Sequence, residues 1–126
     1  QHQVRTTNHM TLYLLVASGG MIGALLRYGI SQWQPHISTT FAINIFGSFL
    51  LGAFMAWQSQ NPNISPALKA LVSAGILGAF TTFSTFSMES FHLINKGLYA
   101  KAFCYVTASV ILSIGGFALA NTLFKN

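Results

Sequence analysis

Charged residues are almost absent from the first half of this sequence. Between positions 6 and 68 the only one is Arg27. The chain of 126 residues is 52% hydrophobic and only 6% charged, and it contains a single acidic residue, Glu89. Because a soluble domain carries about 25% charged residues, this chain has too few to cover its surface in water. The composition therefore predicts one membrane-embedded domain.

The basic residues do not form a patch. The formal net charge is +5, but the lysines and arginines are scattered along the chain, most of them at the edges of apolar segments. A nucleic-acid surface needs them clustered, whereas scattered charges at segment ends suit anchoring at a membrane interface. We therefore expect a lipid bilayer, and no nucleic acid, as a partner.

Four apolar segments are long enough to cross a bilayer, whose hydrocarbon core of about 30 Å requires about 20 helical residues. After a polar tail at 1–10, which looks extraneous to the domain, we expect spans at 11–30, 40–57, 67–94 and 99–124 within a membrane domain at 11–126. Gly19, Gly20 and Gly23 give the first span a small-residue face for close helix packing. Asn44 and Ser48 lie on a polar stripe of the second span.

The third segment is unusual in its middle, where residues 75–89 read Gly-Ile-Leu-Gly-Ala-Phe-Thr-Thr-Phe-Ser-Thr-Phe-Ser-Met-Glu. Hydroxyl groups at mid-depth cost free energy in lipid unless they are paired. As one straight helix the segment would exceed roughly 40 Å at about 1.5 Å per residue. Because Gly75 and Gly78 weaken the helix, we expect a break after Gly78. The predicted fold is an all-α membrane protein with four transmembrane helices, the third broken near its middle.

The charges give the bundle almost no preferred orientation. Four spans place both termini and the second loop on one side, with Arg5, Lys69 and Lys125. The other side holds Arg27, Lys96 and Lys101. The positive-inside rule therefore hardly discriminates between the two orientations. Either the balance is fortuitous, or the chain inserts both ways and pairs as an antiparallel, dual-topology homodimer.

Three motifs together resemble the Fluc (CrcB) fluoride channels of microbes. They are Gly20-Met-Ile-Gly-Ala-Leu-Leu-Arg-Tyr28, Asn44-Ile-Phe-Gly-Ser-Phe-Leu-Leu-Gly52 and the stretch 75–89. The resemblance implies an antiparallel homodimer with two fluoride pores in the plasma (inner) membrane of a microbe. It implies passive export of fluoride from the cytoplasm and a structural sodium ion at the dimer centre. On this chain the main-chain carbonyls that match the sodium ligands belong to Gly78 and Thr81.

The same resemblance implies that Phe83 and Phe86 line the anion path and that Asn44 donates to the ion. Phenylalanine ring edges carry partial positive charge, and an amide NH₂ is an uncharged donor. Each of these residues also has a purely structural interpretation. Two aromatic residues one helical turn apart are also typical of core packing, and an asparagine in a membrane helix often links two helices.

Four hydroxyl residues and three ionisable ones complete the candidate ion pathway. Ser84, Thr85, Ser109 and Ser113 could form a ladder of donors, or could bond to carbonyls of their own preceding turn. Arg27 could snorkel to the headgroups or concentrate anions in a vestibule. Glu89 could be a helix-end carboxylate paired with lysine or water, or could gate the pore with Tyr105 as a neighbour.

Passive fluoride conduction is the leading functional hypothesis. The alternative is a proton-coupled small multidrug-type dual-topology transporter, which needs an acidic residue in its first helix. Residues 11–30 contain none. A non-transporting assembly subunit would leave the hydroxyls at mid-membrane unexplained. No nucleophile–base pair is visible, so we do not expect an enzyme.

Overall fold

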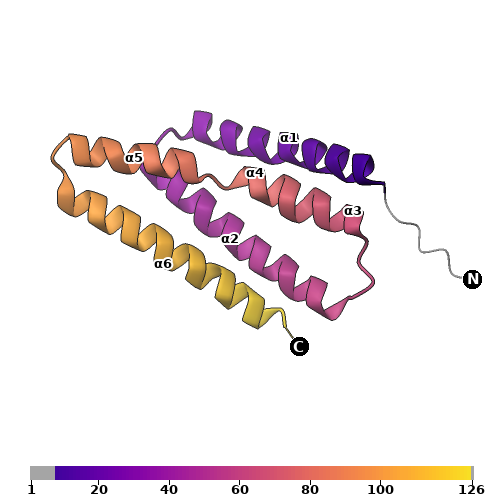
Figure 1. Ribbon diagram of the computed structural model, residues 1–126. Coiled ribbons are helices and arrows are strands. Elements are labelled where there is room, and N and C mark those ends of the chain that lie inside the picture. Colours follow the sequence, from indigo (N-terminus) through magenta and orange to yellow (C-terminus); the bar gives the residue numbers. More distant parts are fainter. Residues whose placement is uncertain (1–7, 126) are drawn as a thin grey trace, which may run out of the picture.

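The computed structural model describes residues 8–125, and in this range the regular structure is entirely helical (Figure 1). Helix α1 is His9–Trp33 and α2 is Ile37–Gln60. The third segment consists of α3 (Pro66–Lys69), a π-helix η1 (Ala70–Leu77), α4 (Gly78–Phe80) and α5 (Phe83–Asn95). Helix α6 is Tyr99–Leu123.

The four predicted spans are confirmed. The first, second and fourth helices and the segment Pro66–Asn95 are each long and apolar enough to cross a membrane. Helix α1 begins two residues earlier than predicted, because the side chain of Asn8 accepts a hydrogen bond from the Met10 backbone N–H at 3.1 Å and caps the helix. Residues 1–7 of the predicted tail lie outside the described residues.

The break in the third segment is confirmed, but it begins after Phe80, two residues later than a break directly after Gly78. Gly78 remains helical, with φ −63° and ψ −35°. The chain becomes extended at Thr81 (ψ 155°) and Thr82 (ψ 116°). The Thr82 side chain accepts from the Thr85 backbone N–H and so caps α5. The N-cap preference of threonine, rather than the weak helix propensity of glycine, therefore sets the position of the break.

The π-helix was not predicted, and it forms the close partner of α1. A Cβ atom at Gly19 would overlap the carbonyl oxygen of Leu71, and one at Gly23 would overlap that of Ile76. Gly20 has nothing within 4 Å of the same position. The small-residue face is thus confirmed for Gly19 and Gly23, which let the α1 backbone lie directly against η1.

Helix α1 runs alongside the first half of the broken segment, and α2 lies against α6 (Figure 1). The start of α1, the end of α6 and the α2–α3 connection lie at one end of the bundle, and the other two connections lie at the opposite end, as four alternating spans require. Only 11% to 28% of each span's most apolar stretch is buried. Most side chains of the single chain therefore face outward, towards lipid or another protein.

Candidate functional site

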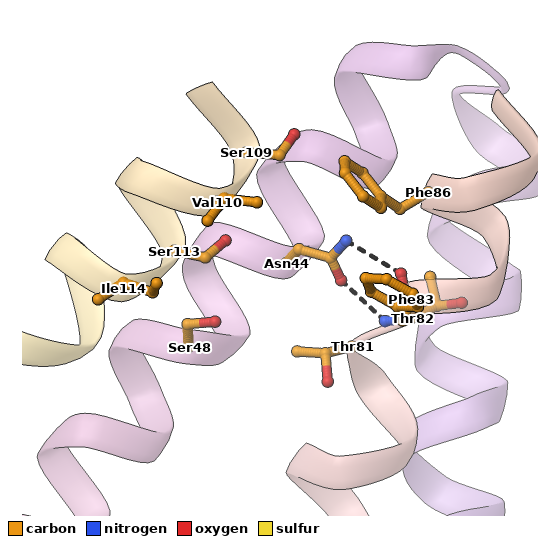
Figure 2. Close-up of a pocket in the computed structure, with 10 residues that line it drawn as sticks. All are labelled: Asn44, Ser48, Thr81, Thr82, Phe83, Phe86, Ser109, Val110, Ser113 and Ile114. Atoms are coloured by element: carbon orange, nitrogen blue, oxygen red, sulfur yellow. Dashed lines mark hydrogen bonds between the residues drawn. The ribbon is translucent and has the colours of Figure 1, made fainter. Parts of the chain in front are cut away.

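A groove of about 290 Å³ lies where α2 and α6 meet the break (Figure 2). Six of its ten lining residues are polar. The lining comes from four parts of the fold: Asn44 and Ser48 on α2, Thr81 and Thr82 in the break, Phe83 and Phe86 on α5, and Ser109, Val110, Ser113 and Ile114 on α6. Five of the predicted site residues thus come together here: Asn44, Phe83, Phe86, Ser109 and Ser113. The Thr81 side chain lines the groove as well, although the prediction concerned its carbonyl.

Asn44 binds the break through both the nitrogen and the oxygen of its side-chain amide. Its Nδ2 donates to the Thr82 carbonyl oxygen at 3.1 Å, and its Oδ1 accepts from the Thr82 N–H at 2.8 Å (Figure 2). These two bonds fix the orientation of the amide, because the flipped side chain would oppose donor to donor. The helix-linking interpretation of Asn44 is therefore confirmed, and one amide hydrogen remains available for a second acceptor.

The backbone carbonyls around the break fall into two groups. That of Leu77 accepts from the N–H and the hydroxyl of Thr81, at 3.3 and 3.2 Å. Those of Ala79 and Thr82 accept from the side chains of Arg27 and Asn44. Three others have no hydrogen-bond donor within residues 8–125: the carbonyls of Gly78, Phe80 and Thr81. The break therefore leaves three neighbouring oxygens free as ligands or acceptors.

The two motif phenylalanines differ sharply in exposure. Phe86 is 8% exposed and packs against Tyr105, with ring centroids 5.3 Å apart. Phe83 is 78% exposed, although its ring centroid lies only 5.6 Å from that of Phe86. Core packing therefore describes Phe86, but it does not describe Phe83 in the single chain.

The four hydroxyl residues do not form one ladder. Ser109 and Ser113 line the groove, whereas Ser84 and Thr85 do not and instead approach the Thr82 hydroxyl, at 3.3 and 3.2 Å. Ser109 is 5% exposed and its hydroxyl is the one buried side-chain polar atom in the described part of the chain that has no hydrogen-bond partner. Ser109 therefore does not bond to a carbonyl of its own preceding turn, the alternative that the sequence left open. An unpartnered buried hydroxyl is unusual, because such groups are normally satisfied.

Glu89 lies outside the groove, at a second cavity of about 340 Å³ that Thr40 and Thr85 also line. Its carboxylate accepts from the Thr40 hydroxyl at 2.7 Å and from the Tyr105 hydroxyl at 2.8 Å. The predicted proximity of Tyr105 is confirmed. Thr40 was missed, since one threonine at the start of a helix carries no signal of a partner 49 residues later.

Arg27 points towards the break. Its Nε donates to the Ala79 carbonyl oxygen at 3.2 Å, a partly buried contact between α1 and the end of α4. Nothing in the sequence predicted this pair.

Backbone oxygens are the best candidate ligands for a metal ion in the described part of the chain. Within residues 8–125 no three His, Cys, Asp or Glu side chains come together. The free carbonyls of Gly78, Phe80 and Thr81 are oxygen ligands of the kind that hard cations prefer. The ligand type at the break therefore fits a hard cation such as sodium.

The sequence matches a family model described as CrcB-like protein, Camphor Resistance (CrcB), over residues 14–121. The chain belongs to this family. Among CrcB relatives, the "Fluoride-specific ion channel FluC" of Saccharophagus degradans is 42% identical over 119 residues, which cover 90% of each chain. A protein of the same name from Shewanella frigidimarina is 46% identical over 111 residues, 83% of this chain and 89% of the relative. Another, from Sulfurovum sp., is 39% identical over 120 residues, covering 90% and 94%.

The CrcB match begins within α1 and ends within α6, so it includes parts of all four spans and every residue that lines the groove. Four spanning helices in a CrcB chain indicate a multi-pass membrane protein. The family resemblance drawn from the three motifs is therefore confirmed.

Proposed function

We propose that this protein is a passive, fluoride-selective channel that exports fluoride from the cytoplasm through the plasma membrane of a microbe. The observation that carries the proposal is the coincidence of two findings. Relatives that align over about 90% of their length are named fluoride-specific channels. The aligned part of this chain contains a groove at mid-span with six polar residues in its lining, where the bilayer would otherwise demand apolar side chains.

In this proposal the ion moves along the groove and exchanges its water for donors of the protein. The second amide hydrogen of Asn44 and the hydroxyls of Ser109 and Ser113 are such donors. Phe83 and Phe86 offer positive ring edges. The N-terminal end of α5 opens at the same place and adds the positive end of a helix dipole. The unpartnered hydroxyl of Ser109 supports this route, because an anion would supply its missing acceptor.

The pathway continues past the break along α5, with Ser84 and Thr85 next. Beyond them lies the cavity of Glu89, whose carboxylate also binds the Tyr105 hydroxyl. A free carboxylate there would repel an anion. The two hydroxyls that donate to Glu89 draw off part of its charge. Exchange of these hydroxyl bonds between Glu89 and a passing ion would make this cavity a gate.

The functional unit in this proposal is an antiparallel homodimer with one groove for each of two pores. Two observations favour a second copy of the chain. Phe83 is 78% exposed beside the groove, and the described basic residues divide two against three between the ends of the bundle. Cysteine labelling in the loops of both ends should report both orientations in one membrane, and labelling from one side only would exclude dual topology.

A structural sodium ion at the dimer centre is the remaining part of the proposal. The free carbonyls of Gly78 and Thr81 support it, since the break exposes them without any competing donor in residues 8–125. Bound sodium would neutralise the negative C-terminal end of α4 and hold the two copies at the break.

The experiment that tests the proposed function is ion efflux from liposomes that contain the purified protein. Fluoride should leave rapidly down its gradient, while chloride, measured in the same vesicles as the control, should stay inside. Equal efflux of the two anions would contradict selectivity, and no fluoride efflux would contradict the channel.

A further inference from the structure

Arg27 makes the only side-chain hydrogen bond that links α1 to the broken segment within residues 8–125. It lies one helical turn after Gly23, on the same face of α1. At Gly23 the α1 backbone approaches so closely that a Cβ atom would come 2.9 Å from the Phe80 nitrogen. This approach brings the guanidinium to the Ala79 carbonyl, 3.2 Å from its Nε.

The carbonyl that Arg27 binds has lost its helical hydrogen-bond donor because of the break. In a continuous helix the Ala79 oxygen would accept from the N–H of Phe83, four residues later. Here Phe83 is the first residue of a new helix, so that bond is absent. The last carbonyls of a helix carry partial negative charge, and a cation near them stabilises the helix end. Arg27 supplies both the missing donor and the cation.

The break is thereby held from two sides. Asn44 on α2 binds Thr82 through two hydrogen bonds, and Arg27 on α1 binds Ala79, three residues earlier. We propose that Arg27 is a positioning residue for conduction: its guanidinium caps α4 at Ala79 and fixes the break, so that Thr82 and the start of α5 face the groove. This role differs from attraction of anions to a vestibule, because it acts through backbone geometry and not through the local ion concentration.

The two roles predict different kinetics for Arg27→Lys, which keeps the charge but loses the planar guanidinium and its Nε–H. A positioning role predicts that maximal fluoride flux falls about ten- to hundredfold, the factor that corresponds to loss of a hydrogen bond to a charged group. The half-saturating fluoride concentration should change little. A vestibule charge predicts nearly full flux in Arg27→Lys, whereas Arg27→Gln should raise half-saturation and lose its effect at high salt.

The flux readout rests on the proposed fluoride function, so a second readout is needed that does not. Hydrogen–deuterium exchange in peptides that cover residues 78–86 reports the order of the break itself. We expect faster exchange there in Arg27→Lys and Arg27→Gln than in the wild type. Tyr28→Phe, a change at the neighbouring residue with 61% exposure, is the control and should leave both exchange and flux unchanged.

The outcomes separate the two proposals. Lower maximal flux at constant half-saturation, with faster exchange at 78–86, supports the positioning role. Full flux in Arg27→Lys, or a change confined to half-saturation, overturns it. If the wild type conducts no fluoride, the proposed function fails and the exchange data alone decide: unchanged exchange in both Arg27 variants then overturns the positioning role.

Discussion

Replacing Asn44 with alanine removes the two hydrogen bonds, at 2.8 and 3.1 Å, that hold Thr82 in the break. Leaving a buried donor or acceptor unpaired costs about 1–3 kcal/mol for each group, which gives an upper figure of about 6 kcal/mol. Hydrogen bonds inside membrane proteins average about 0.6 kcal/mol, which gives a lower figure of about 1.2. Because these bonds are only partly buried, we expect a loss of about 1–3 kcal/mol.

Asn44→Asp distinguishes two roles of the amide: its hydrogen bonds to the Thr82 backbone and its donation to an anion. Aspartate keeps an oxygen for the Thr82 N–H but cannot donate to the Thr82 carbonyl, and it adds a negative charge to the groove. We expect Asn44→Asp to lose fluoride flux more completely than Asn44→Ala. Repulsion in a site of low dielectric should outweigh the hydrogen bond that aspartate retains.

Both quantities are measurable on one preparation. Stability is followed by titrating the protein in mixed micelles with a denaturing detergent, and flux by fluoride efflux from liposomes per folded protein. Ser48→Ala is the matched control, because Ser48 lines the same groove one turn further along α2 and makes no hydrogen bond within the described chain. It should change stability by less than about 0.5 kcal/mol. Asn44→Ala with unchanged stability and unchanged flux would refute the reasoning.

Three further outcomes follow from the fold. Phe83→Ile should suppress fluoride flux without loss of stability, since Phe83 is 78% exposed and only the quadrupole of its ring is lost. Phe80→Ile, a change at a buried residue outside the groove, should lower stability and leave flux unchanged. Equal suppression of flux by both would contradict the aromatic-edge mechanism. Replacing all sodium with a bulky organic cation should stop fluoride efflux, and unchanged efflux would exclude a structural sodium ion. Gly23→Ala should destabilise the protein by several kcal/mol or prevent folding, because the added Cβ would overlap the Ile76 carbonyl. Gly20→Ala, where the added Cβ meets open space, should be neutral or raise stability by about 0.5–1 kcal/mol. Similar effects of the two variants would contradict the packing of α1 on η1.

The sequence was sufficient to predict the four spans and the existence of a break, because both follow from local composition. Apolar length defines a spanning helix, and hydroxyl groups at mid-span are costly unless the backbone departs from a plain lipid-facing helix. The position of the break was not predictable from glycine alone. It depends on Thr82 capping α5 and on Asn44, 38 residues earlier in the chain, binding the same residue.

The candidate site was predicted in part for the same reason. Residues of the motifs, such as Asn44 and Phe83, could be identified, and the structure brings them to one groove. Pairings between distant helices, such as Arg27 with Ala79 and Thr40 with Glu89, have no local signature because they arise from helix packing. The sequence also carries no signal for the π-helix that positions α1, since the composition of this segment is that of an ordinary apolar helix.

The central claim, that fluoride passes along the groove, can be tested by blocking the groove in a working channel. In a Cys104→Ala background, which removes the one native thiol, Ser113→Cys introduces a thiol in the groove, and Thr122→Cys introduces one on the same helix outside it. Both variants are labelled to completion with a bulky thiol reagent, and fluoride efflux from liposomes is recorded before and after labelling. We expect labelling at 113 to reduce efflux to the rate of protein-free vesicles and labelling at 122 to leave it unchanged. Full efflux after complete labelling at 113 would show that the ion takes another route.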